Sequence, residues 1–354
     1  MSWGDAVPEK VCILGHFGEG SNLLNGQTVK TKIVTEELQN QFGQDQVRKV
    51  DTHGGAKTLL KAPFQVYSAL KGSTNVLIFP AQNGLRVYAP LLSFFNRFFG
   101  RKLHYVVIGG WLPAFLKGRK HLSGCLKRFD GIYAETDTMK TALEAQGFDN
   151  VFVMPNCKKL TVLSEDELVY PDGAPYRLCT FSRVMKEKGI ETAINAVETV
   201  NRELGYTAYS LDIYGQVDSA QTEWFEKLKS KFPSYIRYCG LVSFDKSVEV
   251  LKDYFALLFP THYEGEGFAG TLIDAFSAGV PVIASDWKYN VEVVNERVGY
   301  ICSTGDEQVF VQVLKSIALH PMAVMGKKRQ CLKESAKYSV NAAVKILSDR
   351  MKES

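Results

Sequence analysis

The sequence of 354 residues contains no apolar run close to the ~20 residues that a membrane-spanning helix needs. Its opening segment, MSWGDAVPEK, also lacks the apolar stretch of a signal peptide. These two absences predict a protein that neither spans a membrane nor is exported. The formal net charge is only +4, so nucleic acid is not expected as a bulk electrostatic partner.

The cysteines show no pattern that would indicate a metal site or a disulfide framework. They are seven in number, scattered along the chain and mostly placed inside apolar runs. Reduced thiols in protein cores fit this usage, and the expected location is the cytoplasm. The sequence also lacks the Gly-X-Gly-X-X-Gly spacing of a dinucleotide site, which disfavours a nicotinamide-dependent oxidoreductase.

Hydrophobic residues make up 45% of the chain, enough to form two domains of ordinary size. Short apolar runs rich in β-branched residues alternate with helical patterns, which is typical of parallel sheets with crossover helices. The first series of runs is KVCILG, VRKVDTH, TNVLIFP, LHYVVIGG, FDGIYAET and NVFVMPN, and the second is YRLCTFSRV, YSLDIYG, IRYCGLV, YFALLFP, VPVIASD and VGYICST. The sequence therefore predicts an α/β protein with two Rossmann-like domains.

The boundaries follow from a polar segment rich in proline and glycine that separates the two series. We expect a first domain over residues 1–157, a connection over 158–175, and a second domain over 176–338. The tail from residue 307 reads as helical throughout, and we expect its last helix, 339–354, to pack back on the first domain with Ser339 as the N-cap.

The stretch EGEGFAGTLIDAF (264–276) places the carboxylates of Glu266 and Asp274 on either side of a glycine-containing segment. Residues 257–260 read as a strand, and residues 271–279 as a helix that ends at a glycine followed by a proline. The segment between them is then a loop that leads into the N-terminus of a helix.

A helix N-terminus suits a phosphate or diphosphate, and here the amides of Gly270, Thr271 and Leu272 are expected to be free. Glu266 and Asp274 are too far apart to pair on one helix, so they would address separate parts of one ligand, such as hydroxyl groups on both sides of a diphosphate. The simpler alternative is that Glu266 only favours the helix start and that Asp274 is a solvated helix residue.

The combination of Glu266, GFAGTLI, Asp274 and AGVPVIASD resembles the donor-site signature of retaining glycosyltransferases of family 4, of the type that makes bacterial capsules and exopolysaccharides. That family has the GT-B fold, in which two Rossmann-like domains face each other across a cleft. The family has Glu at both ends of the spacer, whereas this sequence has Asp274 at the second end. The resemblance covers essentially the whole second domain.

A second signature supports the same resemblance. FSRVMKEKGIETAINAV (181–197) is similar to the family segment in which an Arg and a Lys hold the donor diphosphate, here Arg183 and Lys188. Two fixed cations would stabilise the charge that develops on a departing nucleoside diphosphate. The alternative is that both are ordinary surface charges.

In the first domain, the loop after the first strand brings Asn25, Gly26 and Gln27 to the start of a helix, where the resemblance implies that Gly26 and Gln27 cap the donor. Many relatives carry a His at the end of the strand LHYVVIGGW, but this sequence has Gly109, Gly110 and Trp111 there. No base in the first domain is therefore evident, and a retaining reaction in which the leaving phosphate takes the acceptor proton needs none.

The resemblance implies a transferase of the hexosyltransferase type, with Glu266, Arg183 and Lys188 as its catalytic residues. It implies that the donor is a nucleotide sugar, most simply a UDP-sugar, bound by the residues Gly26, Gln27, Phe268, Ala269, Gly270, Thr271, Leu272 and Asp274. No cofactor is expected. No metal is expected either, because the Asp-X-Asp spacing that holds a divalent ion in other glycosyltransferases is missing. The alternative is a catalytically silent GT-B subunit or a glycan-binding partner of another glycosyltransferase.

The acceptor is expected to be a saccharide, either free or carried on a polyprenyl diphosphate. The segment YAPLLSFFNRFFGRK (88–102) has an aromatic helical face followed by basic residues, and KGRKH (117–121) adds a second basic stretch. One interpretation is a crossover helix that covers the first sheet. The other is peripheral contact with anionic lipid on the inner membrane leaflet.

Overall fold

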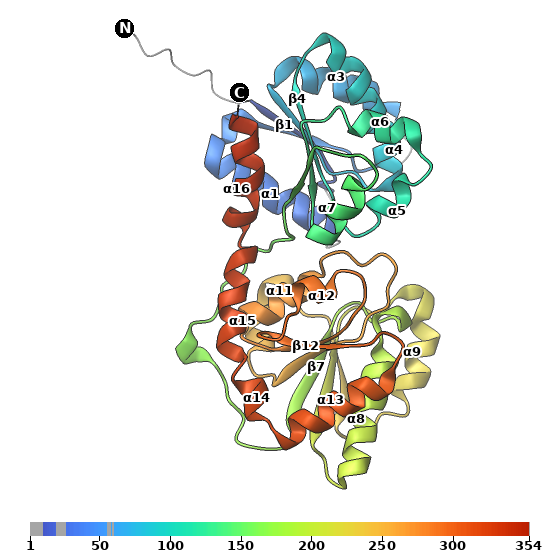
Figure 1. Ribbon diagram of the computed structural model, residues 1–354, viewed down its shortest axis with the longest axis vertical. Helices are drawn as coiled ribbons and strands as arrows, with labels where there is room; N and C mark the ends of the chain where they lie inside the picture. Colours follow the sequence, from blue (N-terminus) through green and yellow to red (C-terminus); the bar gives the residue numbers. More distant parts are fainter. Residues whose placement is uncertain (1–9, 19–25, 55–57, 59, 354) are drawn as a thin grey trace. The chain divides into compact units, whose positions relative to one another are not determined.

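The structure is a computed structural model that describes residues 10–18, 26–54, 58 and 60–353. Its contacts divide the chain into two compact units. The first unit comprises Met1–Lys159 together with Ser339–Ser354, and the second comprises Leu160–Tyr338. Each unit is built around one six-stranded sheet, so the predicted pair of Rossmann-like domains is confirmed (Figure 1).

The sheet of the first unit has the strand order β2-β1-β3-β4-β5-β6, and all its strands are parallel. The strands are β1 (Val11–Gly15), β2 (Val47–Asp51), β3 (Asn75–Ile78), β4 (Lys102–Val106), β5 (Gly131–Ala134) and β6 (Val151–Val153). Strands β1, β3 and β5 are buried along their whole length, which explains why they read as continuous apolar runs rather than alternating ones.

Helices cover the first sheet on both faces (Figure 1). They are α1 (Gly26–Phe42), α3 (Ala62–Gly72), α4 (Gln82–Phe95), α5 (Leu112–Leu116), α6 (Lys120–Leu126), α7 (Asp137–Glu144) and the C-terminal α16 (Val340–Lys352), with short 3-10 turns η1 (Gln44–Gln46) and η2 (Asn96–Phe98). Helix α4 packs against α3 and α6, and α1 packs against α16. Ser339 caps α16 by accepting a hydrogen bond from the amide of Ala342, as its position in the sequence indicates.

The second unit repeats this architecture with the strand order β12-β11-β10-β7-β8-β9, again all parallel. Its strands are β7 (Tyr176–Phe181), β8 (Tyr209–Tyr214), β9 (Ile236–Gly240), β10 (Ala256–Phe259), β11 (Val282–Ser285) and β12 (Gly299–Cys302). Strand order reverses between β7 and β10, because β8 lies on one side of β7 and β10 on the other. In open α/β sheets, ligands bind outside the carboxyl ends of the strands at such a reversal.

The helices of the second unit lie on both faces of its sheet (Figure 1). They are α8 (Ile190–Leu204), α9 (Thr222–Lys229), α10 (Ser247–Leu251), α11 (Gly270–Ser277), α12 (Asn290–Val293), α13 (Glu307–Leu319), α14 (Met322–Met325) and α15 (Lys328–Ser335), with the 3-10 turn η4 (Lys186–Lys188) before α8. The predicted helical tail consists of several helices, with one break at His320 and Pro321. Residues 160–168 pack on this unit, with Leu163 and Leu168 in its core.

Helix α11 ends where the sequence indicates. Gly279 has a φ of 63°, a left-handed conformation that glycine adopts without strain, and the amide of Val280 returns to the carbonyl of Ala275 at 2.8 Å. A Cβ at Gly279 would also lie 2.2 Å from a methyl of Leu168. This tight C-terminus fixes the length of the helix whose N-terminus faces the candidate site.

All seven cysteines are free thiols, and all except Cys239 are buried, as their apolar surroundings in the sequence indicate. Over the described ranges, no single helix combines the length and the hydropathy needed to cross a membrane. One pair reaches that length and composition only when its parts, Glu307–Leu319 and Met322–Tyr338, are joined across a bend of 95°.

His104 is fully buried in the middle of β4. Its two ring nitrogens lie 3.0 Å from the hydroxyl of Tyr133 and 3.0 Å from the side-chain oxygen of Asn75. Burial, helped by the nearby charge of Lys102, lowers the pKa of His104 to about 3. The residue is therefore a neutral core histidine.

We expect His104 to make the protein less stable as the pH falls below about 6.5, because the unfolded chain binds a proton there that the folded chain does not. Between pH 7 and pH 5 the loss from this residue is about 2 kcal/mol, and it continues towards the folded pKa. Urea unfolding at both pH values should show a smaller pH effect in the variant His104→Gln. An equal pH effect in both proteins would contradict the assignment.

Candidate functional site

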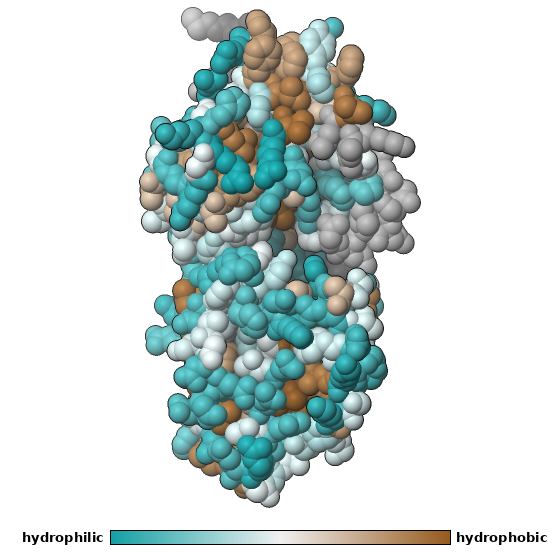
Figure 2. All heavy atoms as spheres, turned by 90° about the vertical axis from the view of Figure 1, so that its right-hand side faces the viewer, coloured by the Kyte–Doolittle hydropathy of each residue, from teal (hydrophilic) through white to brown (hydrophobic). Residues whose placement is uncertain are grey.

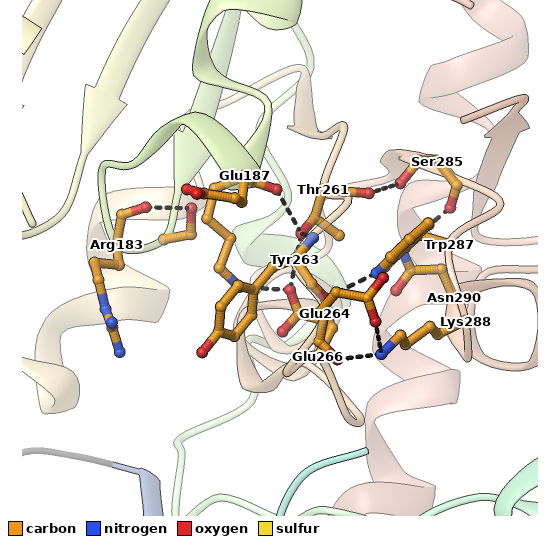
Figure 3. A network of polar contacts seen from close by, with 12 residues as sticks. Arg183, Glu187, Thr261, Tyr263, Glu264, Glu266, Ser285, Trp287, Lys288 and Asn290 are labelled. Carbon is orange, nitrogen blue, oxygen red and sulfur yellow. Dashed lines mark hydrogen bonds and ion pairs between the residues drawn. The ribbon is translucent and has the colours of Figure 1, made fainter. Parts of the chain in front are cut away.

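Three loops meet at the carboxyl edge of the second sheet, because β7, β10 and β11 are parallel neighbours. Residues 182–189 follow β7, residues 260–269 follow β10, and residues 286–289 follow β11. The predicted residues Arg183, Lys188 and Glu266 all lie in these loops. Figure 3 shows Arg183 and Glu266 among them. The topology therefore collects, from segments eighty residues apart, the groups that the sequence motifs single out.

Glu266 is buried, and one of its carboxylate oxygens is held by two donors. Oε2 accepts a hydrogen bond from Lys188 Nζ at 2.5 Å and another from Thr261 Oγ1 at 2.9 Å. The contacts found among the described residues give no partner to Oε1. The carboxylate is thus fixed in orientation by one oxygen while the other stays able to accept hydrogen bonds.

The ion pair between Lys188 and Glu266 is shielded from water. The side chains are 12% and 9% exposed, and the ammonium also lies 5.2 Å from the ring centroid of Tyr263 and 5.5 Å from that of Phe259. One carboxylate and two aromatic rings therefore compensate this ammonium for the loss of water. From the sequence, Lys188 is expected to contact a diphosphate and Glu266 to contact hydroxyl groups, whereas in the structure the two side chains contact each other.

Thr261 links the three loops through both its side chain and its backbone. Its hydroxyl lies between Glu266 and the carbonyl of Glu187, at 3.4 Å from the latter, and its own carbonyl accepts a hydrogen bond of 2.5 Å from Ser285 Oγ. The amide of His262 donates to the same Glu187 carbonyl at 2.8 Å. Thr261 and Ser285 are fully buried, so these bonds are protected from competition with water.

The loop after β10 is also fastened by the residues that follow β11 (Figure 3). Trp287 Nε1 donates to the carbonyl of Tyr263 at 2.8 Å, and Lys288 Nζ pairs with the carboxylate of Glu264 at 2.9 Å. Lys288 itself has a φ of 48°, which is uncommon for a residue with a side chain and is found mostly where the surroundings enforce it.

Gly189 lets the first turn of α8 approach the loop after β10 closely. It has a φ of 72°, and a Cβ at this position would lie 2.1 Å from the carbonyl oxygen of Pro260. Because no side chain fits there, the residue that follows Lys188 must be a glycine. This contact places Lys188 next to the loop that carries Glu266.

Arg183 lies apart from this network. Its guanidinium forms an ion pair of 3.4 Å with Asp218, which follows β8, and its side chain is 55% exposed. In Figure 3 its guanidinium points away from Glu266. The structure therefore brings Lys188 and Glu266 together and leaves Arg183 at the solvent-exposed side of the same edge.

The N-terminus of α11 agrees in part with the expectation of free amides. The amide of Leu272 donates to the carbonyl of Ala269 at 3.1 Å, so it is not free. The amides of Gly270 and Thr271 have no partner among the described residues, and the buried hydroxyl of Thr271 has none either. Phe268 is buried and packs its ring edge-on against Tyr338, at 4.8 Å between centroids.

Asp274 is buried rather than solvated, which excludes the simpler alternative for this residue. It lies on α11 with an exposed fraction of 1%, and its Oδ1 accepts a hydrogen bond of 2.8 Å from Ser247 at the start of α10. A buried carboxylate in an apolar helix needs such a partner. Its predicted contact with a ribose stays a prediction.

In the first unit, Gly26 begins α1 and Gln27 is tied to the sheet, since its Nε2 donates to the carbonyl of Phe79 at 2.8 Å. Asn25 lies outside the described residues. His16 Nε2 lies 2.8 Å from His53 Nδ1 at the carboxyl edge of this sheet. Burial and the neighbouring His53 lower the pKa of His16 below its ordinary value.

Sequence motifs did not single out Thr261, Ser285 or Lys288. A signal for the first two was present, because each is a small polar residue at the carboxyl end of an apolar strand, where parallel sheets assemble their sites. The position of Lys288 carried no such signal, since its left-handed backbone and its pairing with Glu264 depend on tertiary contacts.

We expect Gly189→Ala to destabilise the second unit strongly, because it adds a clash with the Pro260 carbonyl to the strain of a left-handed alanine. Gly205→Ala is the matched control, since Gly205 has a φ of 77° but open space around its Cβ position. The control should lose about 1 kcal/mol and Gly189→Ala at least about 2 kcal/mol more, measured by chemical denaturation. Equal losses would show that the close contact is absent.

Residues 175–319 match the family model described as glycosyl transferases group 1. Among curated proteins, the chain is 30% identical over 178 residues to the GtfA subunit of a UDP-N-acetylglucosamine–peptide N-acetylglucosaminyltransferase from Streptococcus agalactiae, covering 50% of this chain and 33% of that protein. It is 26% identical over 233 residues to the corresponding subunit from Streptococcus gordonii, covering 63% and 43%. The chain therefore spans less than half the length of these curated relatives.

Two solved structures share the architecture over nearly the whole chain. Sucrose-phosphate synthase from Thermosynechococcus elongatus has a TM-score of 0.76 at 14% identity, covering 96% of this chain and 98% of that one. HepE from Anabaena, solved in complex with UDP, has a TM-score of 0.73 at 15% identity, covering 96% and 98%. The comparisons thus support a group 1 glycosyltransferase domain over residues 175–319, within a chain that has the GT-B fold.

Proposed function

We propose that this chain is a glycosyltransferase that moves a sugar from a UDP-sugar to a saccharide or lipid-linked saccharide acceptor. The main support is the Glu266 carboxylate, which is held by one oxygen at the carboxyl edge of the second sheet and keeps the other as an acceptor. The family match over residues 175–319 supports the same reaction. The streptococcal subunits are named for UDP-N-acetylglucosamine and HepE was solved in complex with UDP, which supports uridine as the nucleoside.

In this proposal the donor lies across the loops after β7 and β10. Glu266 Oε1 accepts hydrogen bonds from hydroxyls of the donor sugar, and the diphosphate lies against Lys188, Arg183 and the amides of Gly270 and Thr271. These cations and amides neutralise the charge on the departing phosphate, so the reaction needs no metal. Asp274 accepts hydrogen bonds from the ribose in exchange for the one from Ser247.

The reaction proceeds with retention of the anomeric configuration. The bond between the anomeric carbon and the phosphate oxygen breaks, and the acceptor oxygen bonds to the same face of the sugar. The proton of the acceptor hydroxyl passes to the leaving phosphate oxygen, which gives a glycoside and UDP. No protein base is needed for this step, and Lys188 stabilises the negative charge of the leaving group from its position beside Glu266.

Binding of the nucleotide is tested by thermal unfolding of the protein with UDP, GDP or ADP, and then with a panel of UDP-sugars. A ligand at a hundred times its Kd adds about 2.7 kcal/mol to the stability of the folded state, which is easily seen as a higher Tm. We expect a rise with UDP and UDP-sugars, unchanged by EDTA. A rise with GDP or ADP in place of UDP would contradict the proposed donor.

The roles of the cations are tested by the variants Arg183→Gln and Lys188→Gln, with Lys186→Gln as an exposed control in the same loop. Loss of one charge that stabilises the leaving group lowers kcat/KM by about a hundredfold or more, whereas the control should stay within about twofold. Arg183 is half exposed, so its variant keeps the fold intact even if removal of Lys188 does not.

UDP release with candidate acceptors and the anomeric NMR signal of the product measure the rate and the stereochemistry. A product of inverted configuration would contradict retention. Tight UDP binding without turnover on any acceptor would favour the catalytically silent subunit over the enzyme.

A further inference from the structure

Helix α3 of the first unit presents a hydrophobic stripe to solvent. On α3, Phe64 and Tyr67 are 80% and 47% exposed and lie three residues apart, on one face of the helix. Leu60, two residues before α3 begins, is 81% exposed. The opposite face of α3 carries its buried residues, Val66 and Leu70 among them. The exposed residues of this stripe are therefore not needed to cover the core of the first unit.

The neighbouring segment of α4 and η2 repeats this arrangement. Phe94 and Phe98 are 53% and 75% exposed, whereas Leu85 and Leu92 on the same helix are fully buried. The inner side of this segment covers the sheet, as the first interpretation expects, and its outer side carries exposed aromatic rings. Every phenylalanine exposed among the residues with described side chains, Phe64, Phe94 and Phe98, lies on α3, α4 or η2.

The two stripes form one surface because the elements that carry them are in contact. The ring of Tyr67 lies edge-on to Phe99, just after η2, at 5.6 Å between centroids, and Arg101 Nε donates to the carbonyl of Leu70 at 3.1 Å. We call Leu60, Phe64, Tyr67, Phe94 and Phe98 the aromatic face. Figure 2 shows hydrophobic residues gathered in brown on one face of the first unit.

The charge around the aromatic face has one sign. Residues 52–129, which include α3 to α6, contain twelve Lys and Arg and no Asp or Glu. Because the whole chain has a net charge of only +4, the remaining residues carry a net charge of −8 (4 − 12). Lys61, Lys71 and Arg97 are exposed beside the aromatic face, and none of the ion pairs between described residues includes a side chain from 52–129.

We propose that the aromatic face binds the surface of an anionic lipid bilayer, with its rings in the interfacial region and the surrounding Lys and Arg on the lipid headgroups. Exposed aromatics flanked only by cations suit an anionic bilayer, which offers apolar depth and negative charge together. A protein interface typically has few charged residues at its core and balances the sign of charge across its rim. This surface stands independently of the proposed transfer reaction, since it lies wholly on the first unit.

Co-sedimentation with vesicles tests this proposal on the full chain without any nucleotide. The vesicles contain phosphatidylcholine alone or with one third phosphatidylglycerol, at low and at high salt. We expect binding to the anionic vesicles at low salt, weaker binding at high salt, and little to the neutral ones, because headgroup attraction is screened by ions. Each basic residue near the surface is worth about a fivefold change in partition.

Two sets of variants separate the contribution of the basic residues to membrane binding from that of the aromatic rings. The charge set Lys61→Gln, Lys71→Gln and Arg97→Gln should lower partition into anionic vesicles by about a hundredfold at low salt. The apolar set Phe64→Ser, Phe94→Ser and Phe98→Ser should abolish the binding that remains at high salt. The controls are Lys231→Gln, Arg297→Gln and Lys333→Gln, which are exposed on the second unit, and Leu319→Ser with Met322→Ser. Thermal unfolding verifies that all of them fold.

Insertion is measured directly with Phe98→Trp, whose fluorescence should shift to the blue and be quenched by brominated lipid when anionic vesicles are added. Equal binding of the charge set and its control, or no quenching in bound Phe98→Trp, would overturn the proposal. So would a dimer in solution that the apolar set abolishes, because the face would then be covered by a second copy. If UDP fails to bind but the vesicles bind as expected, only the proposed donor is lost.

Discussion

The ion pair between Lys188 and Glu266 is the interaction on which the candidate site depends. It joins the loop after β7 to the loop after β10 in a place that is nearly closed to water, where removing one partner of a pair typically costs about 3–5 kcal/mol. The supporting contacts serve this pair. Thr261 orients the carboxylate, and Gly189 allows the two backbones to meet.

The parallel sheets explain why such an arrangement can form at all. All strands of the second sheet are parallel, so the polar residues that follow β7, β8, β10 and β11 lie at the same edge of the sheet. The site lies where the strand order reverses, between β7 and β10. Arg183 and Asp218 occupy the side of β8, while Glu264 and Lys288 occupy the side of β11.

The sequence predicted the strands and the two Rossmann-like domains well, because continuous apolar runs and capping residues are local signals. Gly279 is an example, since a glycine before a valine and a proline ends a helix whatever its surroundings are. Two contacts were not predictable from the sequence. One is the ion pair between Lys188 and Glu266, and the other is the hydrogen bond that the amide of Leu272 donates to the carbonyl of Ala269. Both depend on the tertiary packing of the loops after β7 and β10 and of the first turn of α11.

The same distinction applies to the first unit. The aromatic residues of the segment 88–102 were evident, but helical spacing alone does not say which of them turn inward. Burial of Leu92 and exposure of Phe98 are decided by the packing of α4 against α3 and the sheet. The one-signed charge of residues 52–129 becomes meaningful once these segments are seen to form adjoining helices.

The contact of Gly189 with Pro260 also sets a steric limit on the distance between the two loops. With backbone already touching backbone, the loops after β7 and β10 cannot move closer together, whatever charges they carry. Removing either charge of the Lys188–Glu266 pair therefore changes the electrostatics of the site, while the contact of Gly189 with Pro260 still limits how closely the two loops can approach each other.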